Sequence, residues 1–441
     1  MPGQEHVAAR MRAAKAATPD DDPGLVPAAA PLVAGDGGGP GGRVPPPTSF
    51  GWKTDRPVLV GLITMLAALG FTLARLQTWA KGSIGEFILV GQHFSTPSQL
   101  PRGIPVVPTY GYDGQFFYRL ALNPLNFSHT AYGITMDRPY RYMRIGYPVL
   151  TWLVSLGQHV VVPVMLVAVN VAAIGAIGYL GAVFARQGGR HAAWGLLLPG
   201  YFGLITSLSR DTAEPLAAAC LLAGLLALRA RRPVLAALLL AYGALTRETV
   251  MVAVAAVAIL RVIGIVRRRR RPDRDDLPWA LPTAAFAGWQ VVVKAATGSI
   301  PILADGGRNA GTPFLAAFDA LKSNLGHINV HQFDQYDLWL LELAILIGFS
   351  VAALSSLRAT SAPVHERLAF VLYLVEICVV TPDTWNSLDA DLRSFIEVYL
   401  LAVIILLGTP RRNLGTWLLP TLAASVTPAL IVVTQRRLTI S

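Results

Sequence analysis

The chain has 441 residues, of which 53% are hydrophobic and only 14% charged, and its mean hydropathy is +0.49. A soluble protein carries roughly 25% charged residues, so this composition excludes an ordinary soluble enzyme and predicts a membrane protein. The net charge of +11 does not indicate nucleic-acid binding, because the arginines concentrate in short connections between apolar segments.

Residues 1–56 are rich in proline, glycine and alanine, with runs such as GDGGGPGGRVPPP. This composition cannot bury a core, so we predict a disordered cytoplasmic tail. The tail lacks the basic start and directly following apolar core that are typical of a cleaved signal peptide, so we expect the first apolar segment to be retained. Residues 57–441 are predicted to form one polytopic membrane domain.

Apolar segments that approach or exceed the roughly 18 residues needed to cross a bilayer recur along the rest of the chain. Because open strands cannot span lipid, they predict an all-α transmembrane bundle of about 10–12 helices. Residues 147–156 are either part of such a span or a separate half helix. The predicted spans are 57–79, 160–185, 191–208, 212–228, 233–245, 249–266, 279–295, 338–357, 368–381, 395–407 and 414–433.

Arginine clusters set the expected orientation of these helices. They occur at 186–190, 229–232 and 267–274, all in short connections, which the positive-inside rule places in the cytoplasm. With a cytoplasmic N-terminus, the two long connections, approximately 80–146 and 297–337, fall on the external face. We therefore predict a multi-pass protein of the plasma (inner) membrane, and the high Ala, Gly and Arg usage indicates a bacterium.

The first long connection contains the stretch GYDGQFFYRLALNPL, residues 111–125. Tyr112, Phe116 and Leu120 recur every four residues, which predicts an amphipathic helix lying along the membrane surface. Asp113 stands at its start, where the helix dipole favours an acid. Two roles are open for Asp113: an N-cap that only stabilises the helix, or a rigid carboxylate that meets a lipid-borne substrate.

The register from Tyr112 to Ala121 resembles the first-loop motif of the GT-C membrane glycosyltransferases, particularly the PIG-V and PIG-M type mannosyltransferases. RIGYPVLTWLVSLG at 144–157 is similar to the start of that family's second membrane helix, and ALTRETVMVA at 244–253 to its arginine-containing helix boundary. The chain departs from the motif at Tyr112, where the family has Trp, and after Ala121, where Asn123 and Pro124 lie near instead of the usual Gly and Tyr. The sugar therefore stays open.

This resemblance implies a GT-C-like fold and transfer of a sugar from a polyprenyl-phosphate donor to a cell-envelope acceptor, which is a glycan, a lipid or a protein. The reaction inverts the anomeric carbon, and the resemblance implies Asp113 as the general base that accepts the proton of the acceptor. Cations stabilise the departing phosphate. Whether a divalent metal assists stays open.

Arginine suits the phosphate because its fork matches two phosphate oxygens. Arg210, Arg247 and Arg393 adjoin predicted external helix ends. Each has an acid close in sequence, which suggests as the structural alternative an ion pair that fixes a helix end. These acids are Asp211, Glu248 and Asp391.

A second basic group, Arg138, Arg141 and Arg144, lies where the first long connection returns to the membrane. Contact with lipid head groups is the alternative to phosphate binding for this group. Asp113 is thus the candidate catalytic residue. The candidate substrate-binding residues are Tyr112, Arg138, Arg141, Arg210, Asp211, Arg247, Glu248 and Arg393.

The second long connection offers weaker signals. His327 and His331 are four residues apart with Asp334 nearby, but no HExxH glutamate or cysteine accompanies them, so we predict no metal site. ADGGRNAG at 304–311 lacks the Lys and Ser or Thr of a P-loop, which favours a lipid-linked donor over a nucleotide.

Two other classes of protein compete with an enzyme. A transporter or flippase of polyprenyl-linked sugars would also need apolar helices and external arginines, and its signature is charge in the middle of spans. Glu342 and Glu376 are the main residues of that kind. A scaffold would explain the hydrophobicity but not the gathering of acids and arginines on one face.

Overall fold

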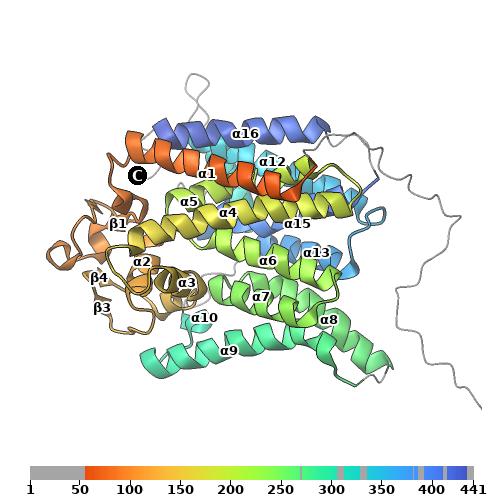
Figure 1. Ribbon diagram of the computed structural model, residues 1–441, viewed down its shortest axis with the longest axis horizontal. Helices are drawn as coiled ribbons and strands as arrows, with labels where there is room; N and C mark the ends of the chain where they lie inside the picture. Colours follow the sequence, from red (N-terminus) through yellow and green to blue (C-terminus); the bar gives the residue numbers. More distant parts are fainter. Residues whose placement is uncertain are drawn as a thin grey trace, which may run out of the picture. The chain divides into compact units, whose positions relative to one another are not determined.

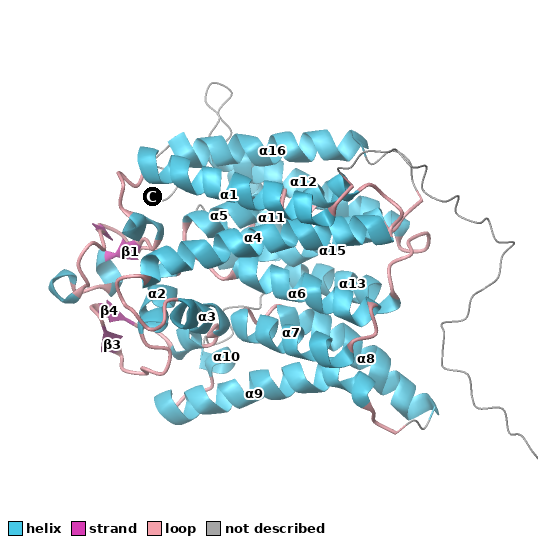
Figure 2. Cartoon of the chain, in the orientation of Figure 1, coloured by secondary structure: helices cyan, strands magenta, loops and turns pink. Residues whose placement is uncertain are grey.

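The computed structural model describes residues 55–268, 271–304, 312–327, 335–380, 382–385, 392–410 and 415–434. These residues belong to one compact unit, Ser49–Ser441, and they are mostly helical (Figure 1, Figure 2). The predicted disordered tail lies outside the described residues except for Asp55 and Arg56.

Four helices in the described part of the chain are long and apolar enough to cross a membrane. This confirms that the chain is mostly helical and contains helices of membrane-spanning length, whereas the bundle of about 10–12 transmembrane helices stays a prediction. The four helices are α1 (Pro57–Thr78), α4 (Val162–Gln187), α8 (Val250–Arg268) and α12 (Gln335–Ser356).

The remaining apolar segments also form helices. The half helix expected at 147–156 is α3 (Gly146–Val154). The others are α5 (Phe202–Ser209), α6 (Glu214–Arg229), α7 (Pro233–Thr246), α9 (Leu277–Thr297), α13 (Val364–Val379), α15 (Ile396–Leu407) and α16 (Gly415–Thr434).

Shorter helices lie in the connections. The α-helices among them are α2 (Gly114–Leu122), α10 (Pro301–Ala304), α11 (Leu315–Gly326) and α14 (Pro382–Trp385). The 3₁₀ turns are η1 (Ile84–Phe87), η2 (Gln92–Phe94), η3 (Pro97–Gln99), η4 (Pro139–Tyr142), η5 (Ala192–Leu197), η6 (Arg274–Asp276) and η7 (Arg393–Phe395).

The segment 191–208 is not the continuous helix that its apolar composition predicts. The turn η5 ends at Leu197 and α5 begins only at Phe202. Pro199 and Gly200 lie between them. Proline lacks the amide hydrogen that a helix interior needs, and glycine loses the most backbone entropy in a helix, so the helix breaks at this pair.

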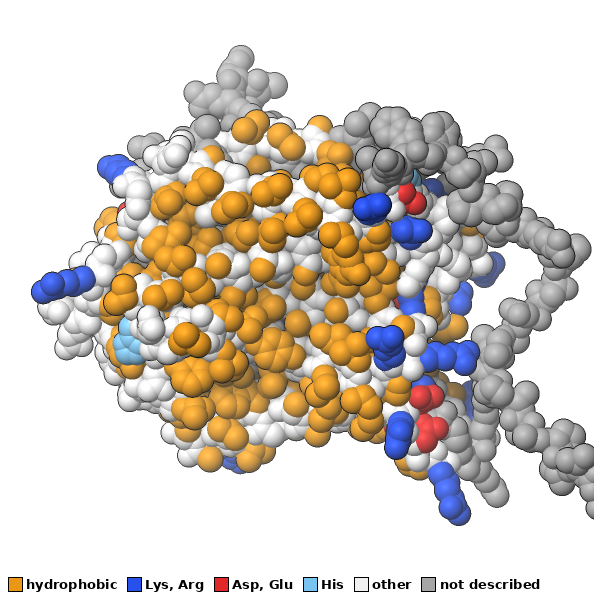
Figure 3. All heavy atoms as spheres, in the orientation of Figure 1, with side chains coloured by type: hydrophobic (Ala, Val, Ile, Leu, Met, Phe, Trp, Pro, Cys, Tyr) orange, Lys and Arg blue, Asp and Glu red, His pale blue; other side chains and the backbone are white. Residues whose placement is uncertain are grey.

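The interior of the bundle is built around α15, in which all twelve residues are buried. The outer helix α1 contrasts with it, because Leu62, Leu66 and Leu73 of α1 are exposed. Figure 3 shows hydrophobic side chains spread over the helices on one face, with several Lys and Arg side chains gathered beyond one end of this apolar surface. An apolar surface of this extent is typical of helices that face lipid.

Ion pairs and hydrogen bonds join the helix ends at the basic end of the bundle. Arg229, the last residue of α6, lies 2.5 Å from Glu366 in the first turn of α13. Arg190, just after α4, donates a hydrogen bond of 3.0 Å to the carbonyl oxygen of Leu407, where α15 ends. Arg229 also donates a hydrogen bond of 3.0 Å to Gln187, the last residue of α4, so the arginine clusters 186–190 and 229–232 lie at the same end of the bundle.

The first long connection folds into a lobe at the opposite end of the helices (Figure 1). It contains two small sheets of two strands each. In the first, β1 (Val90–Gly91) pairs in parallel with β2 (Val106–Val107). In the second, β3 (Thr130–Ala131) pairs antiparallel to β4 (Ile134–Thr135).

Helix α2 forms in this lobe where the sequence predicts a helix, but it is not an exposed amphipathic helix. All nine of its residues are buried. The connection itself covers the polar side: Gln115 accepts a hydrogen bond of 3.1 Å from the amide of Gly91, and Arg119 donates to the carbonyl oxygen of Ser128. The prediction of an interfacial surface helix is therefore wrong. The spacing of four predicts that the polar side chains face water, but they form hydrogen bonds with the backbone of the loop instead.

Candidate functional site

Two glycines bring the start of α2 close to the rest of the molecule. Gly111 has a φ of +70°, a conformation that favours glycine. A Cβ atom on Gly114 would collide with the carbonyl oxygens of Arg210 and Ile88. Asp113, between these glycines, is therefore held directly against the turn that joins α5 to α6.

Asp113 occupies the N-cap position of α2, but its side chain makes no capping hydrogen bond. Its Oδ1 lies 2.7 Å from Nη1 of Arg141, and its Oδ2 lies 3.1 Å from Nη2 of Arg393. The side chain of Asp113 is 26% exposed, so it is partly open to solvent. Burial opposes ionisation, yet the charges of Arg141 and Arg393 outweigh it and hold the pKa of Asp113 well below its ordinary range. The sequence leaves two roles open for Asp113. A purely capping role requires a hydrogen bond from a backbone amide of α2 to the Asp113 side chain, and that bond is not formed.

The ring of Tyr112 lies beside two of the candidate arginines. The guanidinium carbon of Arg210 is 4.4 Å from the ring centroid, and that of Arg393 is 4.7 Å from it. Both distances are within the range of cation–π contacts. Together with Arg141, three arginines from distant parts of the chain therefore surround Tyr112 and Asp113.

A buried charge network continues from Arg393 into the bundle. Arg393 lies 2.9 Å from Glu214, the first residue of α6. Arg247, which follows α7, lies 3.9 Å from Glu214 and 2.9 Å from Glu397 in the first turn of α15. These side chains are nearly inaccessible to solvent, and buried charges are tolerated only when they are paired in this way.

A further ion pair joins the end of the first connection to the start of α8. Arg144 donates two hydrogen bonds to Glu248, of 2.8 and 2.6 Å, and the hydroxyl of Tyr140 donates a third of 3.0 Å. Burial opposes the ionisation of Glu248, but Arg144 prevails and lowers the pKa of Glu248 to about 2.

The pairing of arginines with acids differs from the pairing that sequence proximity suggests. Arg247 pairs with Glu397 and not with its neighbour Glu248, which pairs with Arg144. Arg247 has extended backbone angles, and successive side chains of an extended segment point to opposite sides. Asp391, the acid expected beside Arg393, lies outside the described residues.

Two of the candidates contribute less to this assembly. Asp211 is fully buried, and neither of its carboxylate oxygens makes a hydrogen bond within the described part of the chain. Burial raises the pKa of Asp211 well above its ordinary value, against the opposing charge of Arg75. Arg138 lies 3.5 Å from Asp137, and its side chain is 39% exposed.

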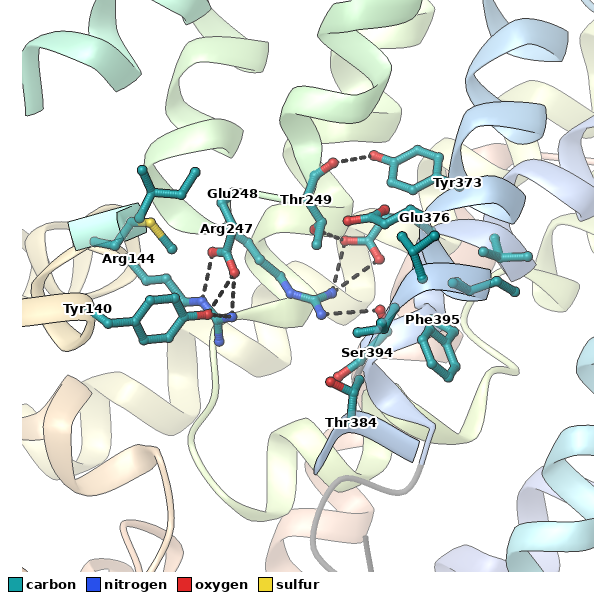
Figure 4. Close-up of a pocket in the computed structure, with 17 residues that line it drawn as sticks. Tyr140, Arg144, Arg247, Glu248, Thr249, Tyr373, Glu376, Thr384, Ser394 and Phe395 are labelled. Atoms are coloured by element: carbon teal, nitrogen blue, oxygen red, sulfur yellow. Dashed lines mark hydrogen bonds and ion pairs between the residues drawn. The ribbon is translucent and has the colours of Figure 1, made fainter. Parts of the chain in front are cut away.

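A cavity of about 270 Å³ adjoins the network (Figure 4). Its polar wall contains both members of the Arg144–Glu248 pair and both members of the Arg247–Glu397 pair. Asp113 does not line the cavity. The ion pairs of Arg393, Glu214 and Arg247 connect Asp113 to the cavity wall, so the two belong to one charged region. The apolar wall includes Ile302, Ile377, Val380 and Phe395.

Four residues of this region are missing from the sequence-based candidates. Glu214 and Glu397 stand at the starts of apolar helices, where an ionisable residue requires a buried partner. That requirement is the signal by which the sequence indicates them. Arg144 belongs to the basic group at 138–144, and only its geometry separates it from Arg138; Tyr140 carries no distinguishing signal.

Within the described residues, no group of three or more His, Cys, Asp and Glu side chains is arranged to hold a metal ion. His331 and Asp334, which the sequence places near His327, lie outside those residues. No protein-family model and no curated protein matches this chain.

Proposed function

We propose that this protein is a GT-C-type membrane glycosyltransferase that moves a sugar from a polyprenyl-phosphate donor to a cell-envelope acceptor on the external face. The observation that carries the proposal is the accessible carboxylate of Asp113, held between Arg141 and Arg393 at the end of an apolar helix bundle. The resemblance of residues 112–121 to the GT-C first-loop motif supports the same role for Asp113.

In the proposed reaction, Asp113 accepts the proton of the acceptor hydroxyl. A bond forms between the acceptor oxygen and the anomeric carbon, the bond from that carbon to the phosphate oxygen breaks, and the phosphate leaves with the electron pair. Because its pKa is low, Asp113 is ionised at neutral pH, which is the form that a base needs.

The same low pKa makes Asp113 a weak base while both arginines are paired with it. A donor phosphate competes for these guanidinium groups, since phosphate and carboxylate share the geometry that arginine recognises. Binding of the donor would therefore draw Arg141 or Arg393 away and raise the basicity of Asp113 when substrate is present. The arginines would then stabilise the charge that develops on the departing phosphate.

The decisive experiment incubates the purified full-length protein with a panel of radiolabelled polyprenyl-phosphate sugars and extracted envelope acceptors. The proposal predicts that label from one donor moves to the acceptor fraction. Absence of transfer from every donor, in a preparation that unfolds cooperatively, contradicts it.

Glutamates within two helices favour the alternative of a transporter or flippase of polyprenyl-linked sugars. Glu342 in α12 is 5% exposed, and Glu376 lies in the last turn of α13. Proteoliposomes separate the two functions, because a transporter moves the intact lipid-linked sugar across the bilayer, whereas an enzyme cleaves its bond to phosphate.

A further inference from the structure

Three glutamates line the cavity beside the charge network, and they differ in their partners. Glu248 receives hydrogen bonds from Arg144 and Tyr140, and Glu397 receives them from Arg247 and Thr249. A ligand can reach those carboxylates only by breaking an ion pair.

Glu376 is different, because it makes no hydrogen bond or ion pair with any part of the chain that the structure describes. It is partly buried, and Figure 4 shows it in the cavity wall beside Thr249. Tyr373, Glu376, Ile377 and Val380 follow helical spacing and all line the cavity. The end of α13 thus presents a carboxyl group with free acceptor capacity to the cavity.

The composition of the cavity limits what this carboxylate can bind. Both arginines in its lining are paired with glutamates, Arg144 with Glu248 and Arg247 with Glu397. A phosphate could bind either guanidinium only by breaking an ion pair, whereas an uncharged ligand leaves both pairs intact. The volume of about 270 Å³ lies just below the roughly 300–1,000 Å³ typical of ligand pockets, which suits one small polar ligand.

We infer that this cavity binds a sugar ring and that Glu376 accepts hydrogen bonds from its hydroxyl groups, so that Glu376 helps to determine which sugar is used. A carboxylate offers two acceptor oxygens, and neighbouring hydroxyls of a sugar offer two donors. Tyr373 and Phe395 supply aromatic surface for the apolar face of the ring. This inference rests on the proposed glycosyl transfer, and the ring belongs to either the donor or the acceptor.

Steady-state transfer by Glu376→Gln and Glu376→Ala distinguishes these two sources. If the donor sugar occupies the cavity, the KM for the donor rises roughly 10-fold in Glu376→Ala, as expected for losing two hydrogen bonds, while kcat changes less than about threefold. If the acceptor sugar occupies it, the KM for the acceptor rises instead. Asp319→Asn on α11 is the matched control, because it removes an exposed carboxylate that does not line the cavity.

Unchanged KM values for both substrates in the two Glu376 variants would overturn the inference and leave the proposed function intact. A second measurement does not depend on turnover: saturation-transfer NMR with a panel of uncharged methyl glycosides. We expect at least one glycoside to bind the wild-type protein and the Asp319→Asn variant, and to bind Glu376→Ala at least tenfold more weakly. Binding that is absent from the wild type, or equal in all three proteins, contradicts the inference even if no transfer is detected.

Discussion

Asp113 illustrates how a residue at a helix start can be held in place without capping the helix. Its two oxygens bind Arg141 and Arg393, and each arginine also has another acidic partner, Asp137 for Arg141 and Glu214 for Arg393. Removing the charge of Asp113 therefore leaves neither arginine without an acid. This arrangement allows the chemistry of Asp113 to be tested separately from the stability of the fold.

We predict that Asp113→Asn lowers kcat for sugar transfer by about 100- to 10,000-fold, because the amide keeps the shape of the side chain but cannot act as a base. Donor binding should persist, and the thermal midpoint should fall moderately, because the low pKa of Asp113 means that its charge stabilises the fold, while each arginine keeps a second acid. Asp113→Glu should recover little activity, since the added methylene displaces the carboxylate. Near-normal turnover by a well-folded Asp113→Asn protein would show that Asp113 is not the base.

The pair between Glu248 and Arg144 predicts a pH dependence of stability. The pKa of Glu248 is about 2 in the folded protein and roughly 4.3 in an unfolded chain, so its stabilisation is complete above about pH 4.5 and is lost as the pH falls toward 2. We expect Glu248→Gln to lower the thermal midpoint at pH 7. The difference in thermal midpoint between the variant and the wild type should become smaller as the pH falls from 5 to 2.5. A difference in thermal midpoint that stays constant with pH would contradict this assignment.

At the level of elements, the sequence predicts where helices form, but it does not predict which segments pack against them. The apolar run at 57–79 is sufficient to predict α1, and the period of four at residues 112–120 is sufficient to predict α2. The burial of α2 depends on Gln115, which accepts a hydrogen bond from the amide of Gly91 and donates one to the carbonyl oxygen of Tyr110. Both residues belong to a loop whose path has no periodic pattern. Sequence spacing identifies a helix face but not the segment that covers it.

We predict that Gly114→Ala destabilises the protein by about 1–3 kcal/mol and reduces activity, because the added methyl group overpacks the contact between α2 and the backbone of Arg210. The matched control is Gly264→Ala in α8, where no atom lies within 4 Å of the new Cβ. That substitution should be neutral or stabilising, since alanine favours a helix more than glycine does. Thermal unfolding of both variants measures the difference, and equal effects would show that the contact at Gly114 is not tight.

At the level of the whole molecule, the charged residues form two separate groups, one at each end of the bundle. The ion pair of Arg229 with Glu366 lies at one end, and the network from Asp113 to Glu397 lies at the other. The basic clusters made this separation predictable from sequence, because they alternate with the connections that carry the acids. Individual ion pairs were not predictable, since Arg393 and Asp113 are brought together from distant parts of the chain by helix packing alone.

If the two ends face opposite sides of the membrane, cysteines placed at them should differ in reactivity. In a background lacking Cys220 and Cys378, we predict that Ser128→Cys and Ser323→Cys label with an impermeant thiol reagent in intact cells. Both serines are exposed, and they lie in the two connections assigned to the external face.

The comparison variant is Ala230→Cys, at an exposed position within the basic cluster that follows α6. It should label only after the cells are permeabilised, because the positive-inside rule places that connection in the cytoplasm. Permeabilisation also controls for reactivity, since all three cysteines should then label to a similar extent. Equal labelling of the three variants in intact cells would contradict the topology, and an external donor could then no longer be assigned to the end of the bundle that carries Asp113.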